Sequence, residues 1–423
     1  MAPTQFIVRF AFFLVALALL VVAINIVIDP YLLFDTPRIS GLNDRKPSAQ
    51  TNDRKMKQYD AVRRPAHTLA LGSSRIEIGF NPQSDSWRVE DRPVYNLGLA
   101  GSDPGVDARY LRHVIASQMP DNLPKTLIIG LDFESFLYPP SPAGVQAENP
   151  TEASSTSLKV VANGQPNPHR TLQTIKDYVV STLSLEALLD SVSTIFYSQN
   201  RTGVTLDEQG WMNESVFDEA SRANGVAALF LQKNIETVNQ YGSIHLALRQ
   251  AADGSLLDLD AIVELISIAE SIDANVIFFM QPAHVDRWEI FDRLGYWDDI
   301  ERWKTEIVKL VDGEQNRGAK VELWDFASYE HFVQEALPSD SDLDTNLTWF
   351  WEPAHYRTTL GDLMIAKMRD VNSSSEFGVK LTNGNLREWL LKIRADRDQY
   401  RSTQPEQVAR ITSILCSASH CSP

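Results

Sequence analysis

The feature that most constrains this chain is an uncharged apolar stretch of 19 residues near the amino terminus, at positions 10–28. Asn25 is the one polar residue in it. At about 1.5 Å of rise per residue, a helix of this length nearly crosses the ~30 Å hydrocarbon core of a bilayer. The stretch ends in Asp29-Pro30-Tyr31 without the small residues typical of a signal-peptide cleavage site, which predicts a retained transmembrane anchor.

Basic residues flank the predicted anchor on both sides. Arg9 precedes it, and eight Lys and Arg residues follow between positions 38 and 64. Basic residues set orientation mainly within short flanks, and a long domain is exported largely regardless of its charge. We therefore expect a single-pass protein of the cell membrane, with a short cytoplasmic tip and the large domain on the periplasmic side.

Composition and charge exclude several classes of protein. The chain has 423 residues, of which 43% are hydrophobic and 22% charged, as in ordinary folded proteins. A formal net charge of −16 argues against nucleic acid as a partner, because binding to phosphates requires Lys and Arg. Cys416 and Cys421 both lie in the last eight residues and cannot organise the fold; the sequence leaves open whether they pair.

Short apolar runs alternate with segments of helical periodicity, which predicts βαβ units around a mostly parallel sheet. The expected fold class is therefore α/β, a three-layer sandwich of the flavodoxin-like kind. The runs expected to form strands lie at positions 67–71, 94–97, 126–131, 275–280 and 321–325.

The same pattern predicts four parts along the chain. They are a cytoplasmic tip with the anchor (1–29), a polar juxtamembrane linker (30–66), the α/β domain (67–370) and a helical tail (371–423). An insertion at about 138–255 interrupts the α/β domain. Its first part, to position 168, is rich in Pro, Ser and Thr and is expected to be mobile, and the rest to be helices packed beside the sheet.

Residues suited to ester chemistry follow the first predicted strand. Such chemistry needs a nucleophilic oxygen, a base, a group that orients the base, and donors for the oxyanion. The strand ends in Gly72-Ser73-Ser74-Arg75, and glycine lets the backbone turn sharply and expose a hydroxyl. Either serine is a candidate nucleophile.

The other components follow later strands. Asn96, with a side-chain amide, and Gly101, with an unobstructed main-chain N–H, come after the second strand. Near the end of the domain, Glu352 precedes His355 by three positions, a spacing at which a carboxylate can orient an imidazole.

This ordered set resembles the SGNH/GDSL hydrolase superfamily, over most of the predicted α/β domain. The resemblance implies that Ser74 is the nucleophile, third in its Gly-x-Ser block. It implies that Gly101 supplies an oxyanion donor in a block opened by Asn96. It also implies that His355 is the base and that Glu352 orients it.

Within that superfamily, the chain looks most like the membrane-anchored branch that acylates cell-envelope polymers, as in alginate O-acetylation and teichoic-acid D-alanylation. This implies an acylated or acyl-accepting glycan as substrate and a multi-spanning membrane acyltransferase as partner. The chain departs from the family pattern at three positions: Ser73 replaces Asp, Asp132 stands in place of an Asn block, and Glu352 replaces Asp.

Further polar and aromatic residues have two interpretations each. Ser73, Arg75 and His284 are possible substrate contacts, because each follows a predicted strand at the edge where α/β proteins bind ligands. Asp132 and Asp325 are site carboxylates or strand-end caps. The three tryptophans could stack on sugars, although on an amphipathic helix they favour the core; they are Trp288, Trp297 and Trp303.

We expect no metal and no cofactor, because the histidines lack His-x-x-x-His spacing and no glycine-rich phosphate loop is present. Two hypotheses follow. The first is a membrane-anchored serine esterase or O-acyltransferase acting on a cell-envelope polysaccharide. The second is a non-catalytic glycan-binding or assembly protein of the same fold.

Overall fold

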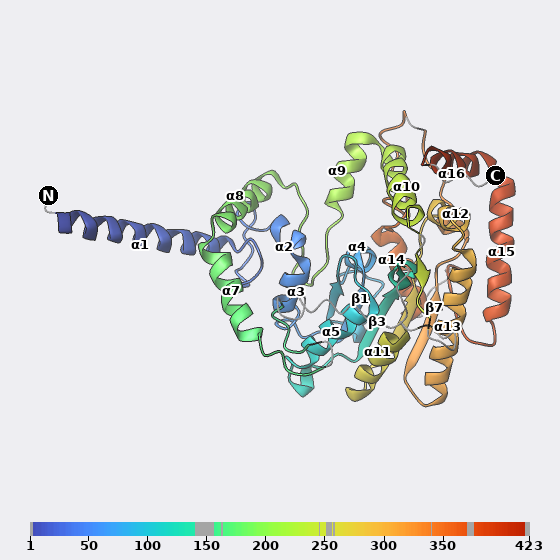
Figure 1. Ribbon diagram of the computed structural model, residues 1–423, viewed down its shortest axis with the longest axis horizontal. Coiled ribbons are helices and arrows are strands. Elements are labelled where there is room, and N and C mark those ends of the chain that lie inside the picture. The colour runs from blue at the N-terminus through green and yellow to red at the C-terminus, as the bar shows by residue number, and fades with distance from the viewer. Residues whose placement is uncertain are drawn as a thin grey trace. The chain divides into compact units, whose positions relative to one another are not determined.

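The computed structural model describes residues 3–139, 156–161, 164–244, 246–250, 256, 259–339, 341–369 and 376–418 (Figure 1). The chain forms two compact units, each built from two separate segments. Unit 1 comprises Met1–Arg64 and Asn149–Val216, and unit 2 comprises Pro65–Glu148 and Phe217–Pro423.

Unit 2 contains a six-stranded, mostly parallel sheet with the strand order β2-β1-β3-β6-β7-β8. The first five strands of that order are parallel, and β8 pairs antiparallel with β7. The strands are β1 (Thr68–Gly72), β2 (Val94–Gly98), β3 (Thr126–Leu131), β6 (Asn275–Met280), β7 (Val321–Asp325) and β8 (Val379–Lys380). The α/β class and all five predicted strands are confirmed.

The parallel strands form because their apolar runs are buried on both faces of the sheet. All residues of β1, β2 and β3 are buried, and only the first residue of β6 is exposed. Phe279 on β6 is fully buried and stacks on Phe80, with ring centroids 5.2 Å apart. The hydrophobic core of unit 2 therefore surrounds the central strands.

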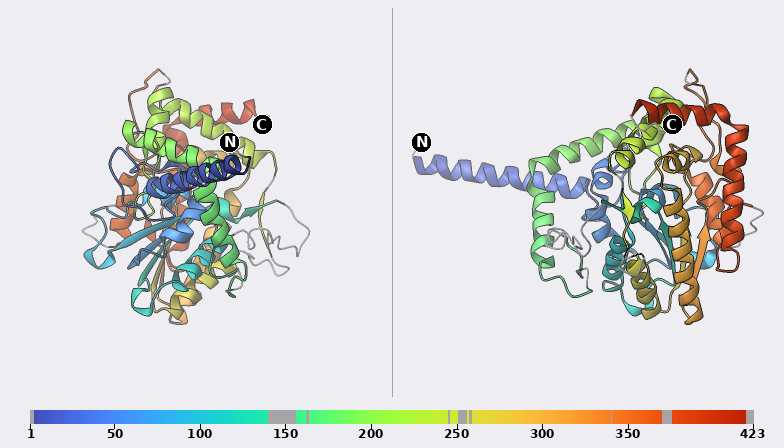
Figure 2. Two further views of the ribbon diagram at one scale, coloured as in Figure 1. Left: turned by 90° about the vertical axis from the view of Figure 1, so that its left-hand side faces the viewer. Right: turned by 45° about the vertical axis from the view of Figure 1, so that its right-hand side comes forward.

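Helices flank the sheet of unit 2 (Figures 1 and 2). The helices before the C-terminal segment are α4 (Ser74–Gly79), α5 (Pro104–Ile115), α9 (Ser215–Asn224, in unit 2 from Phe217), α10 (Val226–Gly242), α11 (Leu259–Ser271), α12 (Val285–Arg293), α13 (Trp297–Asn316) and α14 (Thr358–Arg369). Among these helices, α5 packs against α11, and α14 packs against α4. A second, two-stranded sheet pairs β4 (Leu137–Tyr138) with β5 (Ala247–Leu248).

The C-terminal segment belongs to unit 2 rather than forming a separate tail. It contributes β8 to the sheet edge and two helices, α15 (Leu386–Thr403) and α16 (Pro405–Ser417). Trp389 on α15 donates a hydrogen bond to Asp325 at the end of β7 (2.8 Å), and Ile411 on α16 packs against Ile290. The strand was not predicted from the sequence because two residues are too few to show periodicity.

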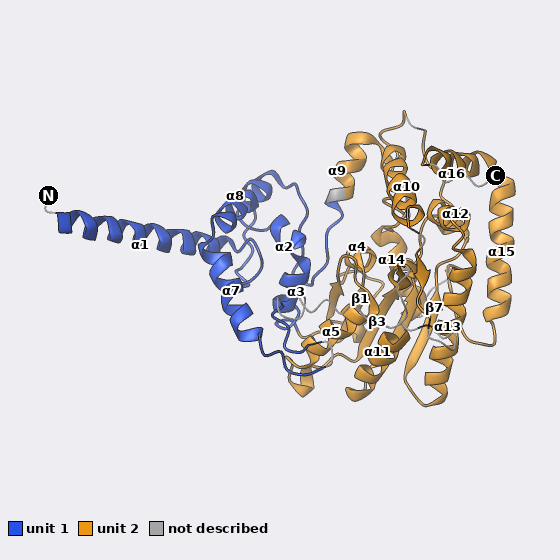
Figure 3. Ribbon diagram, viewed as in Figure 1, with its two compact units in different colours: residues 1–64, 149–216 blue, residues 65–148, 217–423 orange. Residues whose placement is uncertain are grey.

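Unit 1 contains α1 (Pro3–Ile28), α2 (Pro47–Thr51), α3 (Asp53–Asp60), α7 (Arg170–Leu183) and α8 (Leu185–Asn200) (Figure 3). With 26 residues, α1 is long and apolar enough to cross a membrane, as predicted. It packs against α7 and α8.

Two expectations for this part of the chain need correction. The predicted linker at 30–66 is folded, because its polar side chains make buried hydrogen bonds: Lys46 is fully buried and binds the carbonyl oxygens of Ile28 (2.8 Å) and Asp29 (2.7 Å). Helices α7 and α8 of the predicted insertion belong to unit 1, where they pack against α1, whereas α10 of the same insertion belongs to the unit that contains the sheet. Residues 140–155 of the segment predicted to be mobile, and Cys421, lie outside the described residues.

Candidate functional site

The two candidate serines follow β1 and differ in what their hydroxyls contact. Gly72 has φ +136°, and a Cβ there would lie 2.9 Å from Ile76, so only glycine fits this turn. Ser73 is buried and is the N-cap of α4, where its oxygen accepts the Arg75 N–H (3.3 Å). Ser74 is the first residue of α4, and its partly buried hydroxyl lies 2.7 Å from Nε2 of His355.

The Glu352–His355 segment is a tight loop whose own hydrogen bonds fix its shape. The loop is closed by the main chains of Trp351 and His355, with the Trp351 N–H donating to the His355 oxygen (2.9 Å). The Glu352 carboxylate accepts the main-chain N–H groups of Ala354 (3.1 Å) and His355 (2.8 Å). Main-chain hydrogen bonds therefore fix both ends of this loop and the Glu352 carboxylate, independently of the imidazole of His355.

Together these residues form a serine–histidine–carboxylate relay. Glu352 Oε1 binds Nδ1 of His355, which leaves Nε2 to accept the hydroxyl proton of Ser74. The side chain of His355 is 23% exposed and that of Glu352 only 3%, so a substrate can reach the first and not the second. This arrangement can activate Ser74 as a nucleophile.

The charge of Glu352 is stabilised by its partners. Burial alone raises the pKa of this carboxyl, but His355 and the N–H of Ala354 lower it more, to about 2. Glu352 therefore stays ionised at neutral pH and can stabilise an imidazolium.

The two residues expected to supply the oxyanion donors, Gly101 and Asn96, differ in their exposure and in their hydrogen bonds. Gly101 is exposed in the loop after β2, with φ +63° and open space where a Cβ would lie, so its glycine serves the backbone conformation. Asn96 is fully buried, and its amide donates to the carbonyl oxygens of Ile76 (2.8 Å) and Phe80 (2.8 Å). Asn96 therefore ties α4 to β2, and its predicted role as a side-chain donor is corrected.

Arg75 is also used within the fold. It is buried and pairs with Asp132 and with Glu134 (2.8 Å), and Glu134 also pairs with Arg287 (2.5 Å). Although burial raises the pKa of Glu134, the two guanidinium groups lower it to about 2. Asp132 follows β3, and its carboxylate cannot donate a hydrogen bond when ionised. Arg75 is thus a buried residue of α4 whose charge is paired within the fold, and not an exposed substrate contact.

His284 is a structural histidine, in contrast to the prediction that it contacts substrate. It is buried, caps α12 by accepting the Asp286 N–H (3.2 Å), and its Nε2 lies 2.8 Å from the Glu335 carbonyl oxygen. Its main-chain N–H donates to Pro353 (3.0 Å) and so supports the loop that carries His355.

Four residues around the site were not predicted to belong to it: Gln281, Tyr356, Phe217 and Trp351. Gln281 follows β6, accepts the Tyr356 hydroxyl (2.9 Å) and lies 3.5 Å from the Ser73 oxygen. Phe217 stacks on Trp351 (5.8 Å) and lies 5.5 Å from the His355 ring. Position after a strand was the signal available for Gln281, whereas Phe217 comes from a distant helix and carried none.

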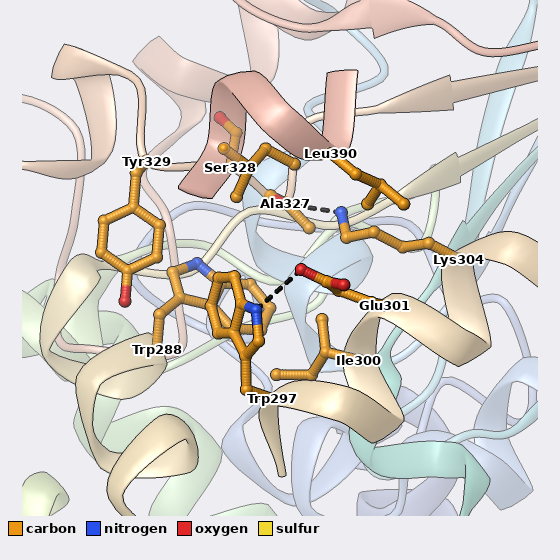
Figure 4. Close-up of a pocket in the computed structure, with 10 residues that line it drawn as sticks. Trp288, Trp297, Ile300, Glu301, Lys304, Ala327, Ser328, Tyr329 and Leu390 are labelled. Carbon is orange, nitrogen blue, oxygen red and sulfur yellow. Dashed lines mark hydrogen bonds between the residues drawn. The ribbon is translucent and has the colours of Figure 1, made fainter. Parts of the chain in front are cut away.

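Of the tryptophans considered for sugar stacking, two belong to the core and the half-buried third pairs with neighbouring side chains. Trp288 and Trp303 are buried, and Trp297 donates to Glu301 (2.8 Å) and stacks with Arg397. Figure 4 shows Trp288 and Trp297 around a cavity of about 10 Å³, which holds no more than one water. None of its lining residues belongs to the Ser74 relay. Asp325 is likewise committed, because it binds Lys304 and Trp389.

Among the described residues, no group of three His, Cys, Asp or Glu side chains is arranged to hold a metal ion. No protein-family profile matches the chain, and comparison with characterised proteins finds no significant match.

Proposed function

We propose that this protein is a membrane-anchored serine ester hydrolase or O-acyltransferase of the SGNH type, acting on an acylated cell-envelope polysaccharide. The observation that carries the proposal is the 2.7 Å contact between Ser74 Oγ and His355 Nε2, backed by Glu352 on the other ring nitrogen. A nucleophile within hydrogen-bond reach of an oriented base is the geometry that acyl transfer requires.

In the proposed reaction, His355 removes the Ser74 proton as the oxygen attacks the acyl carbonyl. Glu352 stabilises the resulting imidazolium, and His355 then returns the proton to the leaving group, which is a sugar oxygen in hydrolysis and the group that carried the acyl chain in transfer. Water or a second sugar hydroxyl accepts the acyl group in the next half-reaction. The resemblance implies that the main-chain N–H groups of Ser74 and Gly101 hold the oxyanion, and the amide of Asn96 is committed elsewhere.

The substrate class and location rest on the resemblance and on α1. The resemblance is to envelope-acylating proteins, and an apolar helix of 26 residues fits anchoring beside an envelope polymer. On this proposal the large domain is periplasmic, the fold is the three-layer SGNH sandwich, and a multi-spanning membrane acyltransferase delivers the acyl group.

A second candidate is a non-catalytic glycan-binding protein. It is favoured by Asp132, a carboxylate paired with Arg75 at the place of the family's amide donor. The Ser74–His355 distance favours the enzyme, because nothing in a binding protein requires that contact.

The test is the hydrolysis of a small acetyl ester by the purified full chain in detergent. Ser74→Ala and His355→Ala should each lower the rate by about 10³-fold or more. Ser73→Ala is the matched control and should keep most of the activity, because Ser73 caps a helix. Equal activity in Ser74→Ala places the nucleophile elsewhere, and full activity in His355→Ala rejects the enzyme.

A further inference from the structure

Helices α7 and α8 of unit 1 direct most of their large apolar side chains outward. On α8 the exposed positions follow helical spacing, at Leu185 (72% exposed), Leu189 (61%), Val192 (57%) and Phe196 (58%). Those on α7 are Leu172, Ile175, Val179, Val180 and Leu183, all between 42% and 71% exposed. We call these nine side chains the α7–α8 apolar face.

The opposite side of the same helices is small and polar. On α8 the buried residues are Ala187, Ser191, Thr194 and Ser198, and on α7 they are Asp177 and Ser181. A helix of a water-soluble domain has the reverse pattern, with its apolar stripe turned to the core. The pattern of α7 and α8 is stable only where the outward side meets an apolar medium.

The position of the apolar face relative to α1 indicates what that medium is. Asn25, near the end of the apolar helix, donates to the Thr182 carbonyl oxygen (2.9 Å) and accepts the Ser191 hydroxyl (2.8 Å). These contacts fix the junction of α7 and α8, where the chain bends by 61°, against the last turns of α1. Within unit 1, α7 runs across the direction of α1, at the edge from which α1 projects (Figures 1 and 2).

We propose that the α7–α8 apolar face lies in the bilayer itself, at the interface where α1 leaves it. The face continues the exposed apolar surface of α1, since Ile26 (37%) and Val27 (51%) are also exposed beside Asn25. The occupant is phospholipid, because the contacts of Asn25 hold the junction of the two helices at the level where the apolar span ends. Amphipathic helices that lie in the plane of an interface bury their apolar side by several ångströms in this way.

The proposal has a structural consequence for unit 1. A single α1 helix alone allows a domain to rotate and tilt on its anchor, whereas three apolar elements meeting the bilayer at an angle restrict both motions. The bilayer thus acts as the missing part of the core of unit 1, and this holds whatever chemistry unit 2 performs.

The experiment uses the full chain in vesicles of phosphatidylethanolamine and phosphatidylglycerol. A diazirine amino acid is placed singly at Ile175, Leu189 or Met119, illuminated, and analysed by mass spectrometry for phospholipid adducts. Met119 is the matched control, an apolar side chain of unit 2 that is 74% exposed. A fourth probe at Leu14 of α1 reports the yield expected within the bilayer.

We expect adducts at positions 175 and 189 within a few-fold of the yield at 14, and at least roughly tenfold above the yield at 119. Yields at 175 and 189 that equal the yield at 119 would show that the face is in water and overturn the proposal. The same probes are also illuminated in native membranes. Crosslinks to another protein there, with no lipid adducts, would also overturn the proposal and assign the face to a membrane-embedded partner.

Discussion

The two units bury opposite kinds of side chain. In unit 2 the strand β3 buries Leu127, Ile128 and Ile129, as a water-soluble sheet does. In unit 1, α8 buries Ser191 and Thr194 beside α1 and exposes its large apolar residues. In both units side chains are buried away from the solvent that suits them least. Apolar residues are therefore buried where the solvent is water, and polar residues are buried where it is the bilayer, as proposed for unit 1. Exposure by itself does not identify a destabilising residue.

The largest effect that tests this comparison comes from two phenylalanines. Phe279→Ala on β6 removes a fully buried ring and should cost about 3–5 kcal/mol. Phe196→Ala on α8 removes a ring that is 58% exposed within the protein, so it opens no internal cavity and should cost no more than about 1–2 kcal/mol, from lost contact with the detergent. Urea unfolding of the full chain in mild detergent measures both. Similar losses of unfolding free energy for Phe279→Ala and Phe196→Ala would contradict the difference between the two units.

A second, smaller effect concerns acid. Burial raises the pKa of Glu352, but His355 and the Ala354 N–H lower it more, to about 2, whereas the pKa of an unfolded glutamate is about 4.3. The folded state therefore binds fewer protons, and this stability is complete above about pH 5 and lost as pH falls toward 2. From pH 7 to 3 the wild type should lose roughly 2 kcal/mol more stability than Glu352→Gln, and the full loss of about 3 kcal/mol is reached only below pH 2. Parallel unfolding curves for the two proteins would contradict the assignment.

The smallest effect lies in unit 1. Lys46→Met keeps an unbranched side chain one atom shorter but leaves two buried carbonyl oxygens at the end of α1 without their donor, at a cost of about 1–3 kcal/mol. The control Lys392→Met, on an exposed pair with Asp396, should cost less than about 1 kcal/mol. Amide exchange in α2 and α3 should rise only in the first variant. Unchanged exchange there would mean that Lys46 does not organise the segment after α1.

The sheet of unit 2 was predictable because a buried parallel strand is a local property: β3 and β6 are each dominated by consecutive apolar residues, at 127–131 and 276–280. The relay was predictable in part, because Ser74 and His355 each follow a recognisable block. The rest depended on long-range partners. Nothing in the residue type of Asn96 or His284 tells whether main-chain groups already use its donors and acceptors.

Unit 1 was harder to predict for a related reason. The segment around Lys46 is polar, which is typical of a linker, but its polar groups find partners at the end of α1 and on α8. Ser198 on α8, for example, accepts the Arg45 N–H (3.0 Å) across 153 positions. Composition reports how polar a segment is and not whether its polar groups are satisfied by the chain or by water.

Ser74 and His355 are 281 positions apart, with the second segment of unit 1 between them in the chain. All five parallel strands precede position 326, so a growing chain can build its sheet before the loop of His355 has been made. Domains generally fold as units during synthesis, and contacts between distant positions form last. A nascent or truncated chain that ends before Trp351 thus carries Ser74 and the five parallel strands but lacks His355. On the proposed mechanism, the order of synthesis therefore keeps incomplete chains inactive.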